Sequence, residues 1–182
     1  MYELLPFWHA VFASLGFEVA VSPFSTRDTY SLGQYSIPSD TACYPAKIMH
    51  GHIEYLLNKN VDAIFYPCLS YNIDEKRGEN HFNCPVVAYY SELLSGNMDS
   101  LSNTKFLYPY LSLRNEKELS KELYRYLVKF FDNITEKDVK VAVKKVDQAC
   151  TKGVIKANTA SRKKSALAKK LNTLKILVYH IL

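Results

Sequence analysis

The stretch Val61-Asp62-Ala63-Ile64-Phe65-Tyr66-Pro67-Cys68 decides the fold. It is almost entirely apolar up to the proline, which is typical of a strand that is buried on both faces of a parallel sheet. A helical pattern over Pro45–Leu57 precedes it, so a helix and a strand follow each other directly along the chain. The stretch therefore predicts an interior strand of an α/β fold.

The same order occurs at the start of the chain. Apolar side chains at helical spacing over Pro6–Leu15 are followed by Gly16 and by a strand-like run over Phe17–Val21. Alternating helices and strands favour a layered parallel sheet. We expect an α/β fold, a parallel-sheet Rossmann-like or flavodoxin-like three-layer domain over residues 1–113, with a helical segment over 114–182 that ends in a possible truncated strand.

Several further elements are predicted with less regular patterns. A polar loop is expected over Leu69–Asn83, and a third strand is expected to begin at Cys84. The segment Lys105–Leu113 reads as extended, with Pro109 fitting an edge strand or a loop because proline cannot donate to a sheet ladder. Two helices are expected next, over Asn115–Phe131 and from Thr135, and the strand-like run Leu174–Leu182 is expected to have no partner following it.

Three of the four cysteines, Cys43, Cys68 and Cys84, lie at the edges of these predicted elements. Their spacings of 25 and 16 residues are too wide for the paired knuckles of a zinc ribbon, but a folded sheet edge could still bring them together. Cys43 stands just before a predicted helix, where free N–H groups favour a thiolate. The alternative for each cysteine is a small buried apolar side chain with no chemistry.

The short sequence motifs around these cysteines resemble those of a known protein family. They read Cys43-Tyr44-Pro45-Ala46-Lys47, Phe65-Tyr66-Pro67-Cys68 and Asn83-Cys84-Pro85-Val86-Val87, together with Leu5-Pro6-Phe7-Trp8 near the start. The chain resembles the acyl-CoA dehydratase activase-related domain, from the group that contains the activator and the iron-sulfur subunits of 2-hydroxyglutaryl-CoA dehydratase. The resemblance covers roughly Leu5 to Leu123, so we expect a fragment of a longer family member, whose last 30 residues depart from the family pattern.

The resemblance implies a function. It implies that Cys43, Cys68 and Cys84 ligate an iron-sulfur cluster, most simply a 4Fe-4S cluster, for electron transfer as an accessory component of 2-hydroxyacyl-CoA dehydratase activation in anaerobic metabolism. The implied partners are an activase ATPase domain or dehydratase subunits. No acid-base pair and no glycine-rich phosphate loop is visible in the sequence, so no catalytic residue is assigned and ATP hydrolysis by this chain is not expected.

Two alternatives stay open from the residues alone. The domain could be an interaction module without catalysis, in which structural cysteines support the docking of an ATPase or dehydratase partner. It could also be a metal-free domain that binds an acyl-CoA ester. His50 and His52 flank Gly51 and point to different faces of a helix, so a metal site on the two histidines together is not expected.

Composition narrows the partners and the compartment. Of the 182 residues 48% are hydrophobic, enough for a buried core. The net charge of +5 comes from basic residues crowded over Lys137–Lys175, whereas the first 100 residues carry more acidic than basic side chains. We interpret the basic segment as a solvated helix face and expect no nucleic acid and no membrane partner. The start of the chain lacks a basic signal-peptide region, so a cytoplasmic location is expected.

Overall fold

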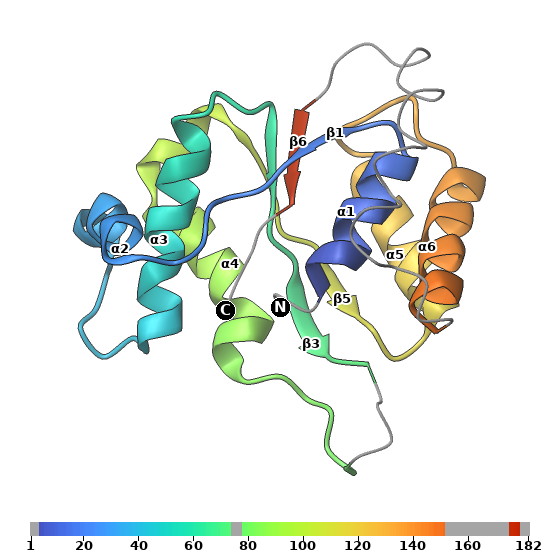
Figure 1. Ribbon diagram of the computed structural model, residues 1–182, viewed down its shortest axis with the longest axis horizontal. Helices are drawn as coiled ribbons and strands as arrows, with labels where there is room; N and C mark the ends of the chain where they lie inside the picture. The colour runs from blue at the N-terminus through green and yellow to red at the C-terminus, as the bar shows by residue number, and fades with distance from the viewer. Residues whose placement is uncertain (1–3, 74–77, 152–174, 179–182) are drawn as a thin grey trace.

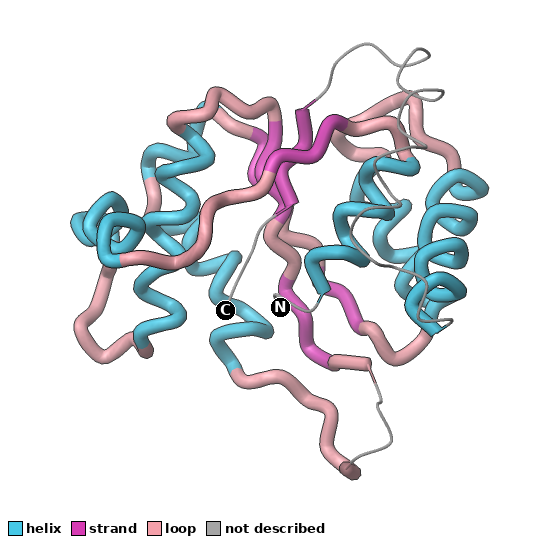
Figure 2. Tube along the Cα trace, viewed as in Figure 1, coloured by secondary structure: helices cyan, strands magenta, loops and turns pink. Residues whose placement is uncertain are grey.

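The computed structural model describes residues 4–73, 78–151 and 175–178. Its strands are seen nearly edge-on in Figure 1, with α1, α5 and α6 on one side and α2, α3 and α4 on the other. Figure 2 shows the same arrangement by type of structure, with helices flanking central strands. The predicted three-layer α/β fold is confirmed. Among the described residues, no helix combines the length and apolarity that crossing a bilayer requires.

The main sheet contains four parallel strands. They are β1 (Glu18–Ala20), β6 (Lys175–Val178), β2 (Ala63–Phe65) and β4 (Lys105–Leu107), in the order β1-β6-β2-β4. Strand β2 thus lies between β6 and β4, which confirms the interior position that its apolar sequence predicted. Strand β6 comes from the end of the chain and pairs with both β1 and β2. The run Leu174–Leu182 therefore supplies an inner strand, although residues 174 and 179–182 lie outside the described residues.

A second, two-stranded parallel sheet continues two of these strands. It pairs β3 (Cys68–Tyr71) with β5 (Tyr110–Ser112). Prolines separate β2 from β3 and β4 from β5, because a proline cannot donate to the ladder. The pairing resumes on either side, since Tyr66 N–H donates to Leu107 O at 2.8 Å and Cys68 N–H donates to Pro109 O at 2.9 Å. The polar loop was predicted to begin at Leu69, but β3 continues to Tyr71, so the loop begins later. The predicted edge position of Pro109 is confirmed, because β4 is an outer strand of the main sheet.

Strand residues alternate between two cores. Ala63 and Phe65 pack on the side of α1, α5 and α6, whereas Ile64 and Tyr66 pack on the side of α3 and α4. This alternation is what a pleated strand that is covered on both faces requires. The largest fully buried side chains are Trp8, Tyr66, Phe12, Phe65, Ile48, Met49, Ile53, Leu56, Ile64, Leu69, Leu94 and Leu107.

The first helical layer consists of α1 (Leu5–Ser14), α5 (Glu116–Leu127) and α6 (Glu136–Thr151). Local signals set their limits. A proline lies in the first turn of α1, and Gly16 follows that helix with φ 91°, a backbone conformation that glycine adopts without strain. Asn115 caps α5 by accepting from the N–H groups of Lys117 and Glu118. The helix predicted over Asn115–Phe131 is confirmed, although it ends earlier, and α6 begins directly after the predicted Thr135.

The opposite layer consists of α2 (Arg27–Gly33), α3 (Tyr44–Leu57) and α4 (Pro85–Asn97), with two short 3₁₀ helices, η2 (Gln34–Ser36) and η3 (Asp99–Asn103). Helices α2 and α3 pack backbone to backbone at Gly33 and Gly51. A Cβ atom at Gly51 would overlap the backbone carbonyl of Thr29, so only glycine fits there. This close approach fixes the position of α3 in the layer.

One predicted element is wrong. The segment from Cys84 to Tyr89 was expected to form a third strand, but it forms the first turns of α4, which packs against β3. The short apolar run Pro85-Val86-Val87-Ala88 has no periodicity that separates a strand from a buried helix turn. Its proline decides the outcome, because proline is favoured in the first turn of a helix, where its missing N–H costs nothing.

Candidate cysteine site

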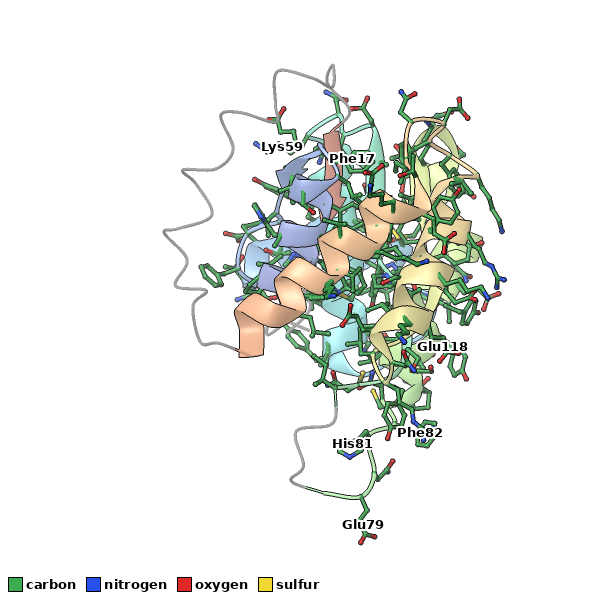
Figure 3. All side chains as sticks on the ribbon, turned by 90° about the vertical axis from the view of Figure 1, so that its right-hand side faces the viewer. Phe17, Lys59, Glu79, His81, Phe82 and Glu118 are labelled. Carbon is green, nitrogen blue, oxygen red and sulfur yellow. The ribbon has the colours of Figure 1, made fainter. Side chains whose placement is uncertain are left out.

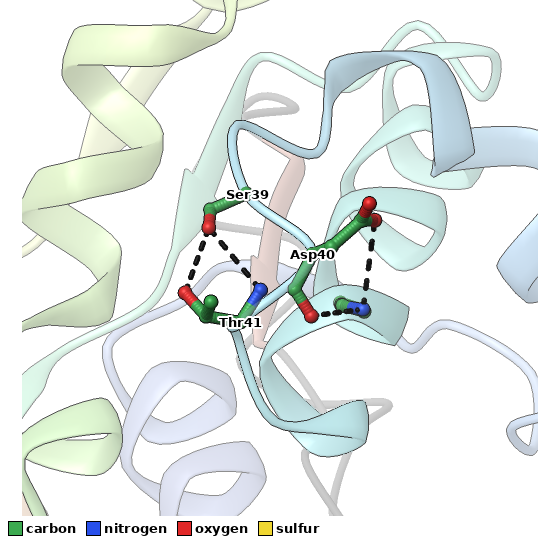
Figure 4. A network of polar contacts seen from close by, with 4 residues as sticks. Ser39, Asp40 and Thr41 are labelled. Carbon is green, nitrogen blue, oxygen red and sulfur yellow. Dashed lines mark hydrogen bonds and ion pairs between the residues drawn. The ribbon is translucent and has the colours of Figure 1, made fainter.

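Cys43 occupies the N-cap position of α3. Its backbone is extended, with φ −64° and ψ 156°, its side chain makes no capping hydrogen bond, and it is exposed. The loop before it is held by polar contacts (Figure 4): Lys47 Nζ donates to Asp40 O at 2.7 Å, and Ser39 Oγ lies 2.7 Å from Thr41 Oγ1. The thiol therefore stands at the positive end of a 14-residue helix, where negative charge is favoured.

Cys84 repeats this arrangement at α4. It is the N-cap residue, with φ −64° and ψ 158°, it makes no capping hydrogen bond and it is exposed. The sequence predicted Cys84 at the start of a strand. This prediction is wrong, because Cys84 precedes the helix α4. Asn83 anchors the approach, since its side-chain amide donates to Leu69 O at 2.9 Å. Figure 3 shows Glu79, His81 and Phe82 in the preceding loop, and the rings of His81 and Phe82 lie against that of Tyr71 at centroid distances of 5.6 and 5.1 Å.

Cys68 has a different environment. It begins β3 and is 0% exposed. Its Sγ lies 2.9 Å from Ser91 Oγ on α4. Burial raises the pKa of the Cys68 thiol, an effect that the contact with Ser91 partly opposes. Cys68 is therefore a neutral thiol at neutral pH.

Tyr66 is a buried phenol two residues before Cys68. Tyr66 is 0% exposed and belongs to the core cluster that joins β2 to α3 and α4. Burial is the main cause that raises the pKa of Tyr66 well above its ordinary value. Tyr66 therefore stays protonated.

The three sulfurs do not form a compact single-ion site. Among the described residues, no group of three or more His, Cys, Asp or Glu side chains is arranged to hold one metal ion. The two histidines flanking Gly51 are also held elsewhere. His50 lies between Ser36 Oγ and Tyr90 OH at 2.9 Å each, and His52 lies between Ser22 Oγ at 3.0 Å and Ser25 Oγ at 2.9 Å. The two rings thus contact different elements, as their predicted opposite orientation required.

Sequence reasoning missed the buried groups behind the cysteines. Ser91 and Ser36 were not singled out, and no hydrogen-bonding role was assigned to Tyr66 or Tyr90. The available signal was the position of Tyr66 two residues before Cys68, on the opposite side of Pro67. The contact of Ser91 and Tyr90 with the site depends on α4 being a helix, so the wrong strand prediction concealed it.

Comparisons with known proteins gave two results. A family model described as "CoA enzyme activase uncharacterised domain (DUF2229)" matches residues 1–179. Part of the chain is also similar to the small ribosomal subunit protein bS20. The protein from Caldanaerobacter subterraneus subsp. tengcongensis is 34% identical over 89 residues, which cover 42% of this chain and 85% of the ribosomal protein. That from Geobacillus thermodenitrificans is 45% identical over 62 residues, which cover 30% and 70%. No solved structure matches the chain.

Proposed function

Because this chain belongs to the family of the CoA enzyme activase uncharacterised domain, DUF2229, we propose that it is an iron-sulfur component of 2-hydroxyacyl-CoA dehydratase activation. In this proposal Cys43, Cys68 and Cys84 ligate a 4Fe-4S cluster. The chain would then transfer single electrons within a larger assembly and dock an activase ATPase domain or dehydratase subunits.

The observation that carries the proposal is the position of the three cysteines on neighbouring elements. Cys43 and Cys84 are the N-cap residues of α3 and α4, and Cys68 begins β3, where its Sγ contacts Ser91 on α4, the helix that Cys84 caps. Soft thiolate ligands are those that iron-sulfur clusters prefer. A cubane binds each thiolate through a different iron, so its ligand sulfurs lie farther apart than the ligands of one ion. The absence of a compact single-ion group in the described residues is therefore compatible with a cluster.

The surrounding residues fit a group of negative charge. Cys43 and Cys84 lie at the N-termini of α3 and α4, and the partial positive charge of a helix N-terminus favours a bound group of negative charge. Exposure of Cys43 and Cys84 gives access from solvent, while the buried Cys68 and Tyr66 exclude water from the inner side. The cluster would supply one-electron chemistry, and the chain would supply ligands, shielding and a docking surface.

Anaerobic reconstitution with iron and sulfide tests the proposal. We expect a brown protein with cluster absorption, and we expect Cys43→Ser, Cys68→Ser and Cys84→Ser each to lose most of the bound iron. The matched control is Cys150→Ser, because Cys150 lies in α6, outside the elements that carry the site. A colourless wild-type protein would sink the proposal. Iron retained equally in all four variants would show that other groups bind it.

The two alternatives predict different results. A metal-free acyl-CoA binding domain should release heat with acyl-CoA esters in calorimetry whether or not iron is present. An interaction module with structural cysteines should bind neither iron nor the ester. Its Cys68→Ser variant should instead lose thermal stability, because Cys68 is fully buried against Ser91.

The similarity to bS20 favours a second candidate function, RNA binding by the basic part of the chain. Twelve Lys and Arg but only two Asp occur over residues 137–175, and such a charge density binds phosphate backbones. The sequence-based expectation of no nucleic-acid partner stays untested. Anisotropy with a labelled RNA at rising salt tests it: replacing Arg162, Lys163 and Lys164 by Gln should weaken binding and reduce the salt dependence. The matching replacement of Lys117, Lys121 and Lys129 on and after α5 serves as control; equal losses would argue for unspecific attraction.

A further inference from the structure

The small sheet of β3 and β5 has one closed edge and one open edge. On the side of β3 the returning chain closes the edge, since Asn83 N–H donates to Ser70 O at 3.0 Å and an antiparallel bridge joins Tyr71 to Phe82. On the side of β5 no strand pairs within the described part of the chain. An open edge offers backbone N–H and C=O groups to another strand.

The backbone groups on the outer side of β5 follow from its hydrogen bonds to β3. Pro109 O accepts from Cys68 N–H at 2.9 Å, so the Pro109 C=O faces β3. The C=O and N–H of one trans peptide point in opposite directions, and therefore Tyr110 N–H points away from β3. Leu113 N–H likewise donates to β3 at 3.0 Å, so the Ser112 C=O points outward. The outer side of β5 thus presents a donor and an acceptor two residues apart.

The adjoining edge beside β4 is covered. Leu107 O accepts from Tyr66 N–H at 2.8 Å, so Tyr108 N–H points outward by the same geometry. Tyr108 N–H donates to the Tyr126 hydroxyl on α5 at 3.1 Å. Among the described residues no side chain accepts from Tyr110 N–H in this way. The open part of the edge is therefore confined to β5.

Exposed apolar side chains flank this open edge. Tyr110 is 50% exposed, Tyr89 54% and Leu93 39%. The ring centroids of Tyr89 and Tyr110 lie 6.2 Å apart, and the Tyr110 hydroxyl donates to Glu92 on α4. Tyr89 and Leu93 are four residues apart, so they lie on one face of α4. We call Tyr89, Leu93 and Tyr110 the edge surface.

We propose that β5 pairs with β5 of a second copy of this chain, antiparallel, around a two-fold axis at Leu111. In this register Tyr110 of each copy lies opposite Ser112 of the other, so each Tyr110 N–H donates to the opposite Ser112 C=O. Residues two apart share one face of a strand, and the small Ser112 side chain leaves room for the Tyr110 ring opposite it. The edge is complementary to itself, which is why we infer a second copy as its occupant. The inference goes beyond the proposed function and requires neither bound metal nor RNA.

The spacing of the helices suits the exposed side chains. Helix α4 packs against β3, so three strand spacings, about 14 Å, would separate the two α4 helices of the dimer. Helices in direct contact lie about 8–10 Å apart, so large side chains have to fill the difference. Tyr89 and Leu93 extend from α4 at this place. Because a three-residue strand forms few hydrogen bonds, burial of the edge surface supplies most of the stabilisation.

Sedimentation equilibrium combined with amide hydrogen exchange of the ¹⁵N-labelled full chain tests the inference. We expect a dimer that dissociates on dilution. The Tyr110 amide should exchange about tenfold more slowly in the dimer than in the diluted protein, because its N–H becomes bonded only there. A monomer at every concentration, or a dimer in which the Tyr110 amide exchanges equally fast, would overturn the inference. Protection that appears only after another protein is added would assign the edge to that protein and would also overturn it.

Variants at exposed positions provide an independent measurement. Tyr110→Lys and Leu93→Lys should each be monomeric, since a charged side chain on an edge opposes pairing and a buried charge is costly. Tyr35→Lys is the matched control, because Tyr35 is 92% exposed on η2 and does not belong to the edge surface. All three variants should keep the circular dichroism of the wild type. Dimers that persist in Tyr110→Lys and Leu93→Lys, or equal dissociation in Tyr35→Lys, would argue against pairing through β5.

Discussion

The contact between α2 and α3 yields the sharpest stability prediction, the effect of Gly51→Ala. Gly51 lies in the middle of α3 and faces α2. A methyl group there would overlap the carbonyl carbon and oxygen of Thr29, and it would approach the backbone N of Gly33 at 3.4 Å. Because these are backbone atoms, no side chain can rotate away, and the two helices must separate.

Two opposing energy contributions set the size of the stability change in Gly51→Ala. Alanine in a helix interior is favoured over glycine by about 1 kcal/mol. Overpacking of a tight contact costs about 1–3 kcal/mol, and more where backbone must move. Separation of α2 from α3 would also lengthen the contact of Ser36 with His50, since Ser36 ends η2, the 3₁₀ helix that follows α2 directly. We expect a net loss of about 2 kcal/mol in the free energy of unfolding.

Urea unfolding followed by circular dichroism measures this loss. The matched control is Gly96→Ala in α4, where an added Cβ would meet nothing within 4 Å. That variant should gain about 0.5 kcal/mol, since it receives the helix preference without the overlap. The two chemically identical substitutions should thus differ in sign. A Gly51→Ala protein as stable as Gly96→Ala would refute the argument that backbone contact requires this glycine.

Two further predictions concern pH and helix capping. The pKa of His50 is lowered to about 4 in the fold, whereas the unfolded chain protonates near the ordinary value of 6.5. As pH falls from about 6.5 to about 4 the unfolded state binds the proton first, so stability should drop by up to about 3 kcal/mol. In His50→Gln the free energy of unfolding should fall less between pH 7 and pH 4.5 than in the wild type, as measured by urea titration at both pH values. An unchanged pH dependence in this variant would contradict the prediction. Asn115→Ala should lower the free energy of unfolding by about 1 kcal/mol, because the N–H groups of Lys117 and Glu118 lose their acceptor. Asn115→Asp should keep most of the stability, since a carboxylate can also cap the helix. Equal losses in both variants would argue against the cap.

The sequence by itself determined the local structure. An apolar run predicted the interior strand β2, glycine and proline marked the ends of α1 and the start of α3, and Asn115 marked the start of α5. These signals work because capping, proline geometry and side-chain periodicity act within a few residues. The family resemblance likewise depends on short motifs around the cysteines. It was expected over roughly Leu5 to Leu123, but the family model matches residues 1–179 and so includes most of the last 30 residues, which were expected to depart from the family pattern.

Only the tertiary structure decided how these pieces meet. The place of β6 between β1 and β2 depends on pairing with strands that are distant in the sequence, and the packing of α4 against β3 joins residues that no local pattern relates. The contact of Cys68 with Ser91 on α4 arises for the same reason, because separate elements of a layered sheet bring together residues that are far apart along the chain. Contacts of this kind are set by the burial of whole faces, which no local stretch of sequence encodes.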